Sequence, residues 1–227
     1  MKTEKVVGIL GGMGPFATLD FFKLIVQYTP AQKDWEHLRI LIDNNVKIPS
    51  RTRAVLYNEQ SPVPYMIKSI NNLAKIGADF VVVPCNSAHY FYKEVLPYIA
   101  IPWISIIEVT SKKIISMGKN SPLIIGGFVT TNKRLYNEFI PDAVYLADEG
   151  NRFIEKLIEE IKLTSTLSQQ SKKAFRKLLE DKKNSMDCIV LACTELPIVY
   201  TEEKIYGFSA INSSKEYACE VVRYARE

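Results

Sequence analysis

Two short sequence patterns occur twice in this chain, in the same order, and they constrain its fold more than any other feature. One is an apolar run that ends in a double glycine, beginning at Gly11 and again at Gly126. The other is an apolar run that ends in a cysteine, at Cys85 and again at Cys193, with nearly the same spacing. Chance similarity is the alternative, because glycine commonly follows a first strand. The matching order and spacing favour a duplicated α/β unit.

The apolar periodicity predicts alternating strands and helices in both halves. In the first half, strands are expected at 6–10, 38–42 and 80–83, with helices at 18–29, at 64–76 and from about 86. In the second half, strands are expected at 123–125 and 188–191, with helices from about 132 and at 153–161, 171–179 and 213–226. This alternation indicates parallel strands that are joined by crossover helices.

The predicted fold class is therefore α/β, with two similar doubly wound, Rossmann-like halves of parallel sheet related by a pseudo-twofold. The chain is expected to cross between halves near Pro102 and Gly207. Residues 1–101 and 208–227 would then form a first domain with Cys85, and residues 102–207 a second domain with Cys193. Ligands of such sheets bind beyond the carboxyl ends of the strands, so both cysteines should line the cleft between the halves.

Composition and charge exclude several classes of function. The formal net charge of +4 comes from scattered basic residues, so nucleic acid is not an expected partner. No apolar run reaches the roughly 18 residues that a membrane span needs. The charged residues 1–5 lead straight into a strand and do not resemble a signal peptide, so a cytoplasmic protein is expected. The four cysteines are expected to be free thiols, and no metal site is expected, since no CxxC pair and only two histidines are present.

A cysteine between a buried strand and a helix meets backbone N–H groups and the positive end of the helix dipole. Both effects favour the thiolate, so the pKa of Cys85 and of Cys193 is expected below the usual value of about 8.5. The alternative is a small buried apolar residue. That alternative is the expectation for Cys188, inside a strand, and for Cys219, on an apolar helix face.

Two opposed thiols without a redox motif suit proton transfer on both faces of one carbon. One thiolate removes the α-hydrogen while the opposite thiol delivers a proton, and the two roles swap with the hand of the substrate. Without a cofactor, the negative charge spreads onto the carboxylate of the substrate and needs hydrogen-bond donors. Asn86, Ser87 and Thr194, next to the two cysteines, are the candidate donors, and helix capping is their alternative role.

Five segments together resemble the aspartate/glutamate racemase superfamily, in the right order and over nearly the whole chain. They are 11–15 (GGMGP), 44–45 (NN), 48–52 (IPSRT), 84–89 (PCNSAH) and 193–197 (CTELP). The first segment and the Cys-Thr-Glu sequence are similar to the aspartate racemase branch; glutamate racemases typically have Asp-Ser-Gly and Cys-Thr-His there. The resemblance implies an enzyme that is independent of pyridoxal phosphate, has no cofactor and forms a homodimer.

The resemblance also implies roles for individual residues. Met13 and Gly14 match the first loop of the pocket, and Asn44 matches an amide that meets the substrate. Arg51 and Lys162 match residues that grip the side-chain carboxylate from the two halves, and a guanidinium is a suitable bidentate clamp. A surface loop is the alternative for the arginine, and a charged helix face is the alternative for the lysine.

Two departures from the family pattern concern the pocket wall. Ser87 stands where threonine is usual and keeps the hydroxyl. The loop after the second double glycine keeps one hydroxyl at Thr130, but Phe128 brings bulk near the cleft. Near the cysteines, His89 is expected to pack beneath the site or support Cys85. Glu195 is expected either to bias its neighbouring thiol toward the protonated form or to cap a helix.

The sequence thus predicts a racemase that interconverts L- and D-aspartate, a small dicarboxylic amino acid. A glutamate racemase or a racemase of broader specificity is the nearest alternative, since one methylene needs only a small change of pocket. A decarboxylase of the superfamily keeps one cysteine and fits less well than a cis–trans isomerase. A non-catalytic amino-acid-binding protein is the remaining alternative.

Overall fold

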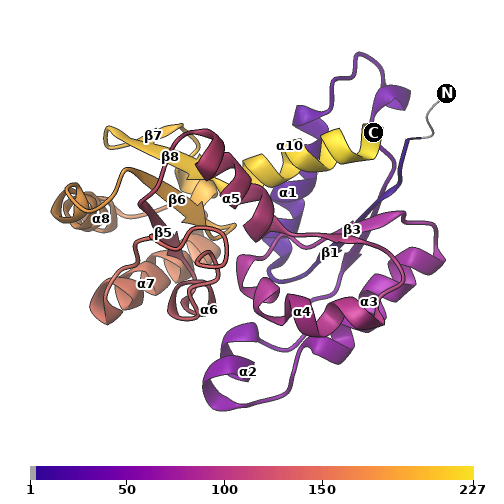
Figure 1. Ribbon diagram of the computed structural model, residues 1–227, viewed down its shortest axis with the longest axis horizontal. Helices are drawn as coiled ribbons and strands as arrows, with labels where there is room; N and C mark the ends of the chain where they lie inside the picture. Colours follow the sequence, from indigo (N-terminus) through magenta and orange to yellow (C-terminus); the bar gives the residue numbers. More distant parts are fainter. Residues whose placement is uncertain (1–3) are drawn as a thin grey trace.

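Two four-stranded sheets organise the two halves of the chain in the computed structural model, which describes residues 4–227 (Figure 1). The first sheet has the order β2-β1-β3-β4 and is parallel throughout. Its strands are β1 (Val7–Gly11), β2 (Ile40–Asn44), β3 (Phe80–Val82) and β4 (Trp103–Ile104). The second sheet has the order β5-β6-β8-β7, in which only β7 is antiparallel. Its strands are β5 (Pro122–Gly126), β6 (Cys188–Ala192), β7 (Lys204–Ile205) and β8 (Phe208–Asn212).

The two sheets repeat one topology. The parallel run β1-β3-β4 in the first sheet has the same order as β5-β6-β8 in the second. Val144 forms a parallel bridge with Leu123 of β5, in the position that β2 has beside β1. The predicted fold class is confirmed: the protein is α/β, with two sheets in which parallel strands predominate.

Helices cover both faces of each sheet. The first half contains α1 (Pro15–Tyr28), α2 (Arg51–Tyr57), α3 (Val63–Lys75) and α4 (Tyr92–Val95), whereas α5 (Ile106–Ser116) begins the second half and packs on α10. The second half contains α6 (Phe128–Asn132), α7 (Asp148–Thr164), α8 (Gln169–Lys182) and α9 (Leu196–Val199), and the chain ends in α10 (Ser213–Arg226). Short 3₁₀ helices lie at Asp34–Glu36, Asn86–Phe91 and Leu96–Tyr98. Because side chains alternate along a strand, Val82 packs toward α1 and α10 while Val81 packs toward α3.

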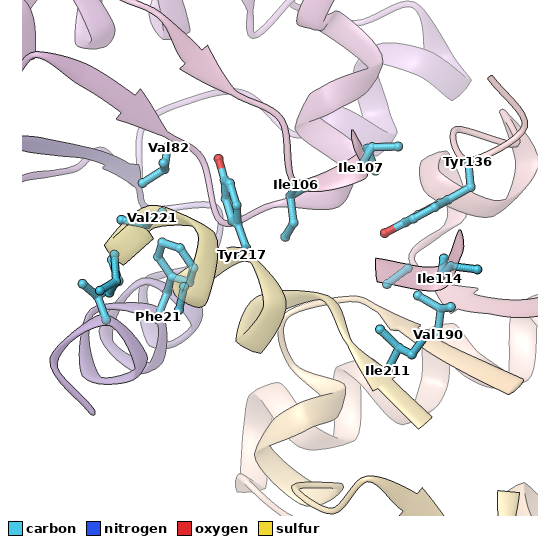
Figure 2. Packing of buried hydrophobic residues seen from close by; sticks show 14 of the residues in the cluster. Phe21, Val82, Ile106, Ile107, Ile114, Tyr136, Val190, Ile211, Tyr217 and Val221 are labelled. Atoms are coloured by element: carbon cyan, nitrogen blue, oxygen red, sulfur yellow. The ribbon is translucent and has the colours of Figure 1, made fainter. Parts of the chain in front are cut away.

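One hydrophobic cluster runs without interruption from the first sheet into the second (Figure 2). Helix α10 contacts both α1 and α5, and the rings of Phe21 and Tyr217 have centroids 5.2 Å apart. Ile114 of α5 joins the same cluster as Val190 of β6 and Ile211 of β8. The final helix therefore packs on the first half, as the sequence predicted, and the halves share a core at their junction.

Three sequence expectations about segments need correction. β4 pairs with β3 and β8 pairs with β6, so the chain changes halves after residue 104 and returns at Ser213. The expected crossing points, near residues 102 and 207, lie just before β4 and just before β8, because neither strand was predicted from the sequence. A helix expected from about residue 132 is wrong: α6 begins at Phe128, directly after β5, and ends at Asn132. The helix cannot continue because Arg134 has a left-handed backbone conformation, with φ of 48°.

Within residues 4–227, no helix combines the length and the apolar character that crossing a membrane requires.

The hydroxyl of Tyr217 joins the C-terminal helix to the two strands beside the Cys85 loop. It accepts a hydrogen bond from the Val83 amide at 3.1 Å and donates one to the Ile104 carbonyl. Tyr217→Phe should lower the free energy of unfolding by about 1–3 kcal/mol, because both backbone groups would be buried without a partner. Chemical denaturation measures the change. Tyr98→Phe, which removes an exposed hydroxyl, should change it by less than about 0.5 kcal/mol, and equal effects of the two substitutions would contradict this account.

Candidate active site

Cys85 lies just beyond the carboxyl end of β3, and the side chain of His89 contacts its backbone. The Ile106 amide donates a hydrogen bond to His89 Nε2 at 3.1 Å, so the ring proton lies on Nδ1. Nδ1 donates to the Cys85 carbonyl oxygen at 2.9 Å. Burial lowers the pKa of His89 to about 4, so the ring is neutral. His89 thus contacts the backbone of Cys85, and its ring stacks on Tyr92.

Cys193 lies at the carboxyl end of β6. Its thiol, the Thr194 hydroxyl and the Lys162 ammonium all approach the carboxylate of Glu195. Its Sγ donates a hydrogen bond to Glu195 Oε2 at 2.9 Å, and Thr194 Oγ1 donates to the same oxygen at 3.3 Å. Lys162 Nζ lies 3.7 Å from Glu195 Oε1. Burial, and then the charge and hydrogen bond of Glu195, raise the pKa of the Cys193 thiol well above its ordinary value. Cys193 is therefore protonated in the resting protein.

The expected lowering of the Cys193 pKa is wrong, and the structure gives two reasons. The helix that follows Cys193, α9, has only four residues, so few aligned backbone dipoles act on the sulfur. The nearest charge is instead the carboxylate of Glu195, which is buried and disfavours a second negative charge.

Both strand-end cysteines line one cavity of about 140 Å³ where the two halves meet. Parallel strands present their carboxyl ends at one edge of each sheet, and the two edges face this cavity. Most of the site residues expected from the sequence lie on its wall: Met13, Arg51, Cys85, Asn86, Ser87, Lys162, Cys193, Thr194 and Glu195.

Four expected site residues are not part of this lining. Asn44 ends β2 and is exposed. Gly14 precedes α1, and a Cβ built on it would lie 3.9 Å from Glu195 Oε1, so it stands just beside the cavity. Thr130 is buried, and its hydroxyl contacts Ser87 Oγ at 3.1 Å. His89 lies behind Cys85, as described above.

Arg51 is the first residue of α2 and points its guanidinium into the site. Nη1 donates to the Pro49 carbonyl at 3.1 Å, and Nη2 donates to the Met13 carbonyl at 3.3 Å. Nε is buried and has no hydrogen-bond partner within residues 4–227. Each Nη carries a second hydrogen, so the guanidinium, fixed by two carbonyls, can still bind an anion.

The side-chain amide of Asn86 has a defined orientation. Oδ1 accepts a hydrogen bond from Tyr136 at 2.8 Å, and Nδ2 donates to Ser213 Oγ at 3.3 Å. Ser213 Oγ in turn donates to the carbonyl of Leu191, one residue before the end of β6, at 2.7 Å. Since the amide nitrogen carries two hydrogens, one remains for a ligand in the cavity.

Sequence reasoning missed several lining residues, of which Glu155 is the most consequential. It lies on α7, seven residues before Lys162, so the two share a face of the helix two turns apart. That spacing could have identified it once Lys162 had been selected. Tyr136 was also missed, because its role depends on a contact with the other half. Ser50, Thr52, Gly127, Ile158 and Ala192 complete the unexpected part of the wall.

Within residues 4–227, no group of three or more histidine, cysteine, aspartate or glutamate side chains is arranged to hold a metal ion.

Removing the charge of Glu195 should make Cys193 more acidic. In Glu195→Gln, alkylation of Cys193 by iodoacetamide should reach half its maximal rate at a lower pH than in the wild type. In Lys162→Gln the midpoint should move to higher pH, because Lys162 lowers this pKa. Mass spectrometry of the Cys193 peptide measures both rates. Shifts of the same sign in the two variants would contradict the electrostatic assignment.

Comparison with known proteins places this geometry in a family. A broad specificity amino-acid racemase of Bacillus subtilis, RacX, is 27% identical over 201 residues, covering 86% of this chain and 87% of that protein. A glutamate racemase of Aquifex aeolicus is 24% identical over 184 residues, covering 79% of this chain and 70% of that protein.

Among solved structures, an aspartate racemase of Picrophilus torridus superposes with a TM-score of 0.86 at 28% identity, covering 97% of this chain and 94% of that one. The family sequence model described as Asp/Glu/Hydantoin racemase matches residues 10–215. The chain therefore belongs to the Asp/Glu/hydantoin racemase family.

Proposed function

We propose that this racemase interconverts L- and D-aspartate without a cofactor, using Cys85 and Cys193 as its two acid/base groups. The observation that carries the proposal is the single cavity lined by both strand-end cysteines, one from each half. A racemase must remove a proton from one face of the α-carbon and deliver one to the other, and two thiols that line one cavity from different halves suit that task.

The protonated state of Cys193 fits one direction of the reaction. The Cys193 thiol is protonated beside Glu195 and can deliver a proton, while Cys85, as the thiolate, takes the α-proton. After the transfer, Cys85 is the thiol and Cys193 the thiolate, which is the starting state for the opposite enantiomer. The charge that develops on the substrate carboxylate would be stabilised by the Asn86 amide and by the hydroxyls of Ser87 and Thr194.

We propose aspartate as the substrate because two cationic side chains, one from each half, line the same small cavity. Arg51 and Lys162 both line it, and a dicarboxylic amino acid offers each of them a carboxylate. The structural relative from Picrophilus torridus, named an aspartate racemase, supports this choice. The second candidate is a glutamate or broad-specificity racemase, which the relation to RacX favours.

The proposal includes a homodimer, as the family resemblance implies, and a cytoplasmic location, which was expected from the sequence independently of that resemblance. Light scattering of the purified protein would measure the mass of the particle in solution and so test the first of these points.

Replacement of either cysteine should stop racemisation. Cys85→Ser and Cys193→Ser should each lose at least roughly a hundredfold in rate, because a hydroxyl is a far weaker base than a thiolate. Each variant should still eliminate a β-leaving group from one enantiomer of an aspartate analogue, and the two should prefer opposite enantiomers. Circular dichroism with the natural substrate, and exchange of solvent deuterium into its α-carbon, measure turnover.

The matched control is Cys219→Ser, which changes a half-buried thiol on α10 outside the cavity and should leave turnover unchanged. Full racemisation by either of the first two variants would refute the two-base mechanism. The same enantiomer preference in both would mean that the cysteines do not face opposite sides of the carbon.

Arg51 should set the preference for an acidic side chain. Arg51→Ala should raise the KM for aspartate roughly tenfold to hundredfold, since a charge-assisted hydrogen bond contributes about 1.5–3 kcal/mol. Arg51→Lys should restore only part of the loss, because an ammonium lacks the bidentate fork. Arg53→Ala is the control: Arg53 lies on the same helix but is exposed and paired with Glu59. Unchanged aspartate kinetics in Arg51→Ala would remove this residue from the site.

A further inference from the structure

Four charged side chains line the catalytic cavity, and three of them already have defined partners or roles. Arg51 and Lys162 supply the positive charges, and Glu195 and Glu155 the negative ones. The oxygens of Glu195 are occupied, because Oε2 accepts from Cys193 and Thr194 while Oε1 faces Lys162. The role of Glu155 is left open.

One of the two carboxylate oxygens of Glu155 is available to accept a hydrogen bond from a ligand. Oε1 accepts a hydrogen bond from the Phe128 amide, at the start of α6. Oε2 accepts no hydrogen bond from residues 4–227, and no cation of these residues lies within ion-pair distance of it. Burial raises the pKa of Glu155, although the Phe128 amide and the charge of Lys162 act in the opposite direction. A partly buried carboxylate of this kind gains stability from a cationic partner.

The absent side chain at Gly127 leaves open the space beside Glu155. A Cβ at this position would lie 3.4 Å from Ser87 Oγ and 3.6 Å from Glu155 Oε1. The Glu155 carboxylate is therefore near the loop of Cys85, whereas the Glu195 carboxylate contacts Cys193. A small group bound between the two cysteines would lie between the two carboxylates.

We infer that Glu155 receives the α-ammonium group of the substrate. This inference rests on the proposed function in one respect, since it takes the substrate to be an acidic amino acid. Such a molecule brings two carboxylates, for the cations of the cavity, and one ammonium that needs a carboxylate partner. Among the cavity carboxylates, Oε2 of Glu155 is the oxygen that no group of residues 4–227 occupies.

Two consequences follow for the chemistry of the site. Glu155 keeps the amino group protonated, and an α-ammonium withdraws electrons from the α-carbon, which makes its proton easier to remove. Glu155 also discriminates against dicarboxylates that lack an amino group, because in their complex its charge would be buried without a partner among like charges.

The test compares two ligands that differ only in the amino group. Racemic aspartate and succinate are titrated calorimetrically into wild-type protein and into Glu155→Gln; the racemate is used so that turnover does not alter the ligand. Glutamine still accepts the Phe128 amide, so α6 keeps its support. Glu155→Gln should bind aspartate roughly tenfold to hundredfold more weakly and bind succinate as well as or better than the wild type.

Glu159→Gln is the matched control, since it removes the same charge one turn further along α7, where the side chain is exposed and outside the cavity. It should leave the affinity for both ligands unchanged. If Glu155→Gln weakened the binding of aspartate and of succinate equally, Glu155 would be only a structural support and the inference would be overturned. Unchanged aspartate binding in this variant would also overturn it. So would a wild-type protein that binds neither ligand. Glu155-dependent binding of aspartate without deuterium exchange would refute the proposed racemisation and leave the inference standing.

Discussion

A buried chain of hydrogen bonds between the two halves fixes the distance between the cysteine loops. Tyr136 of the second half donates to Asn86, which donates to Ser213, which donates to the carbonyl of Leu191 in β6. The three side chains that form this chain are almost completely buried, so breaking one link would leave a polar group unpaired at about 1–3 kcal/mol. The hydrogen-bond chain passes through Asn86, one residue after Cys85, and ends at Leu191, two residues before Cys193. The geometry of the cavity depends on it.

The shared hydrophobic core supports this connection from the other side. Helices α5 and α10 pack on each other and bring residues of both sheets into one cluster, including Val82 and Val190. Domains of one chain move relative to each other by default unless their interface is large and hydrophobic. Here the interface is part of the core, and close-packed interiors resist small displacements. Ala192, on the wall of the cavity of about 140 Å³, belongs to this shared core, so the core holds the wall at the end of β6.

The sequence predicts the features that depend on local pattern and on sheet geometry. The paired cysteines could be assigned to one cleft because parallel strands place their carboxyl ends at one edge. The sheet membership of β4 could not be predicted, because a strand of two residues has no periodicity and is defined by its partner. The sequence left open whether Glu195 keeps the Cys193 thiol protonated or caps a helix, because the direction of its side chain depends on packing; in the structure it contacts the sulfur and raises the pKa of the thiol. Glu155 could have been selected from its seven-residue spacing to Lys162, once it was known that the face of α7 with Lys162 lines the cavity.

The unequal surroundings of the two cysteines are compatible with a reaction between mirror images. Cys193 is bonded to a carboxylate, whereas Cys85 is held through its carbonyl by a neutral imidazole. The two enantiomers have equal free energy in water, so the equilibrium constant of racemisation is one, and kcat/KM must be equal in both directions. The asymmetry of the site can therefore appear only in how kcat and KM are divided for each enantiomer. In the proposed two-base mechanism, a protonated Cys193 favours the resting form that accepts the enantiomer whose α-proton faces Cys85.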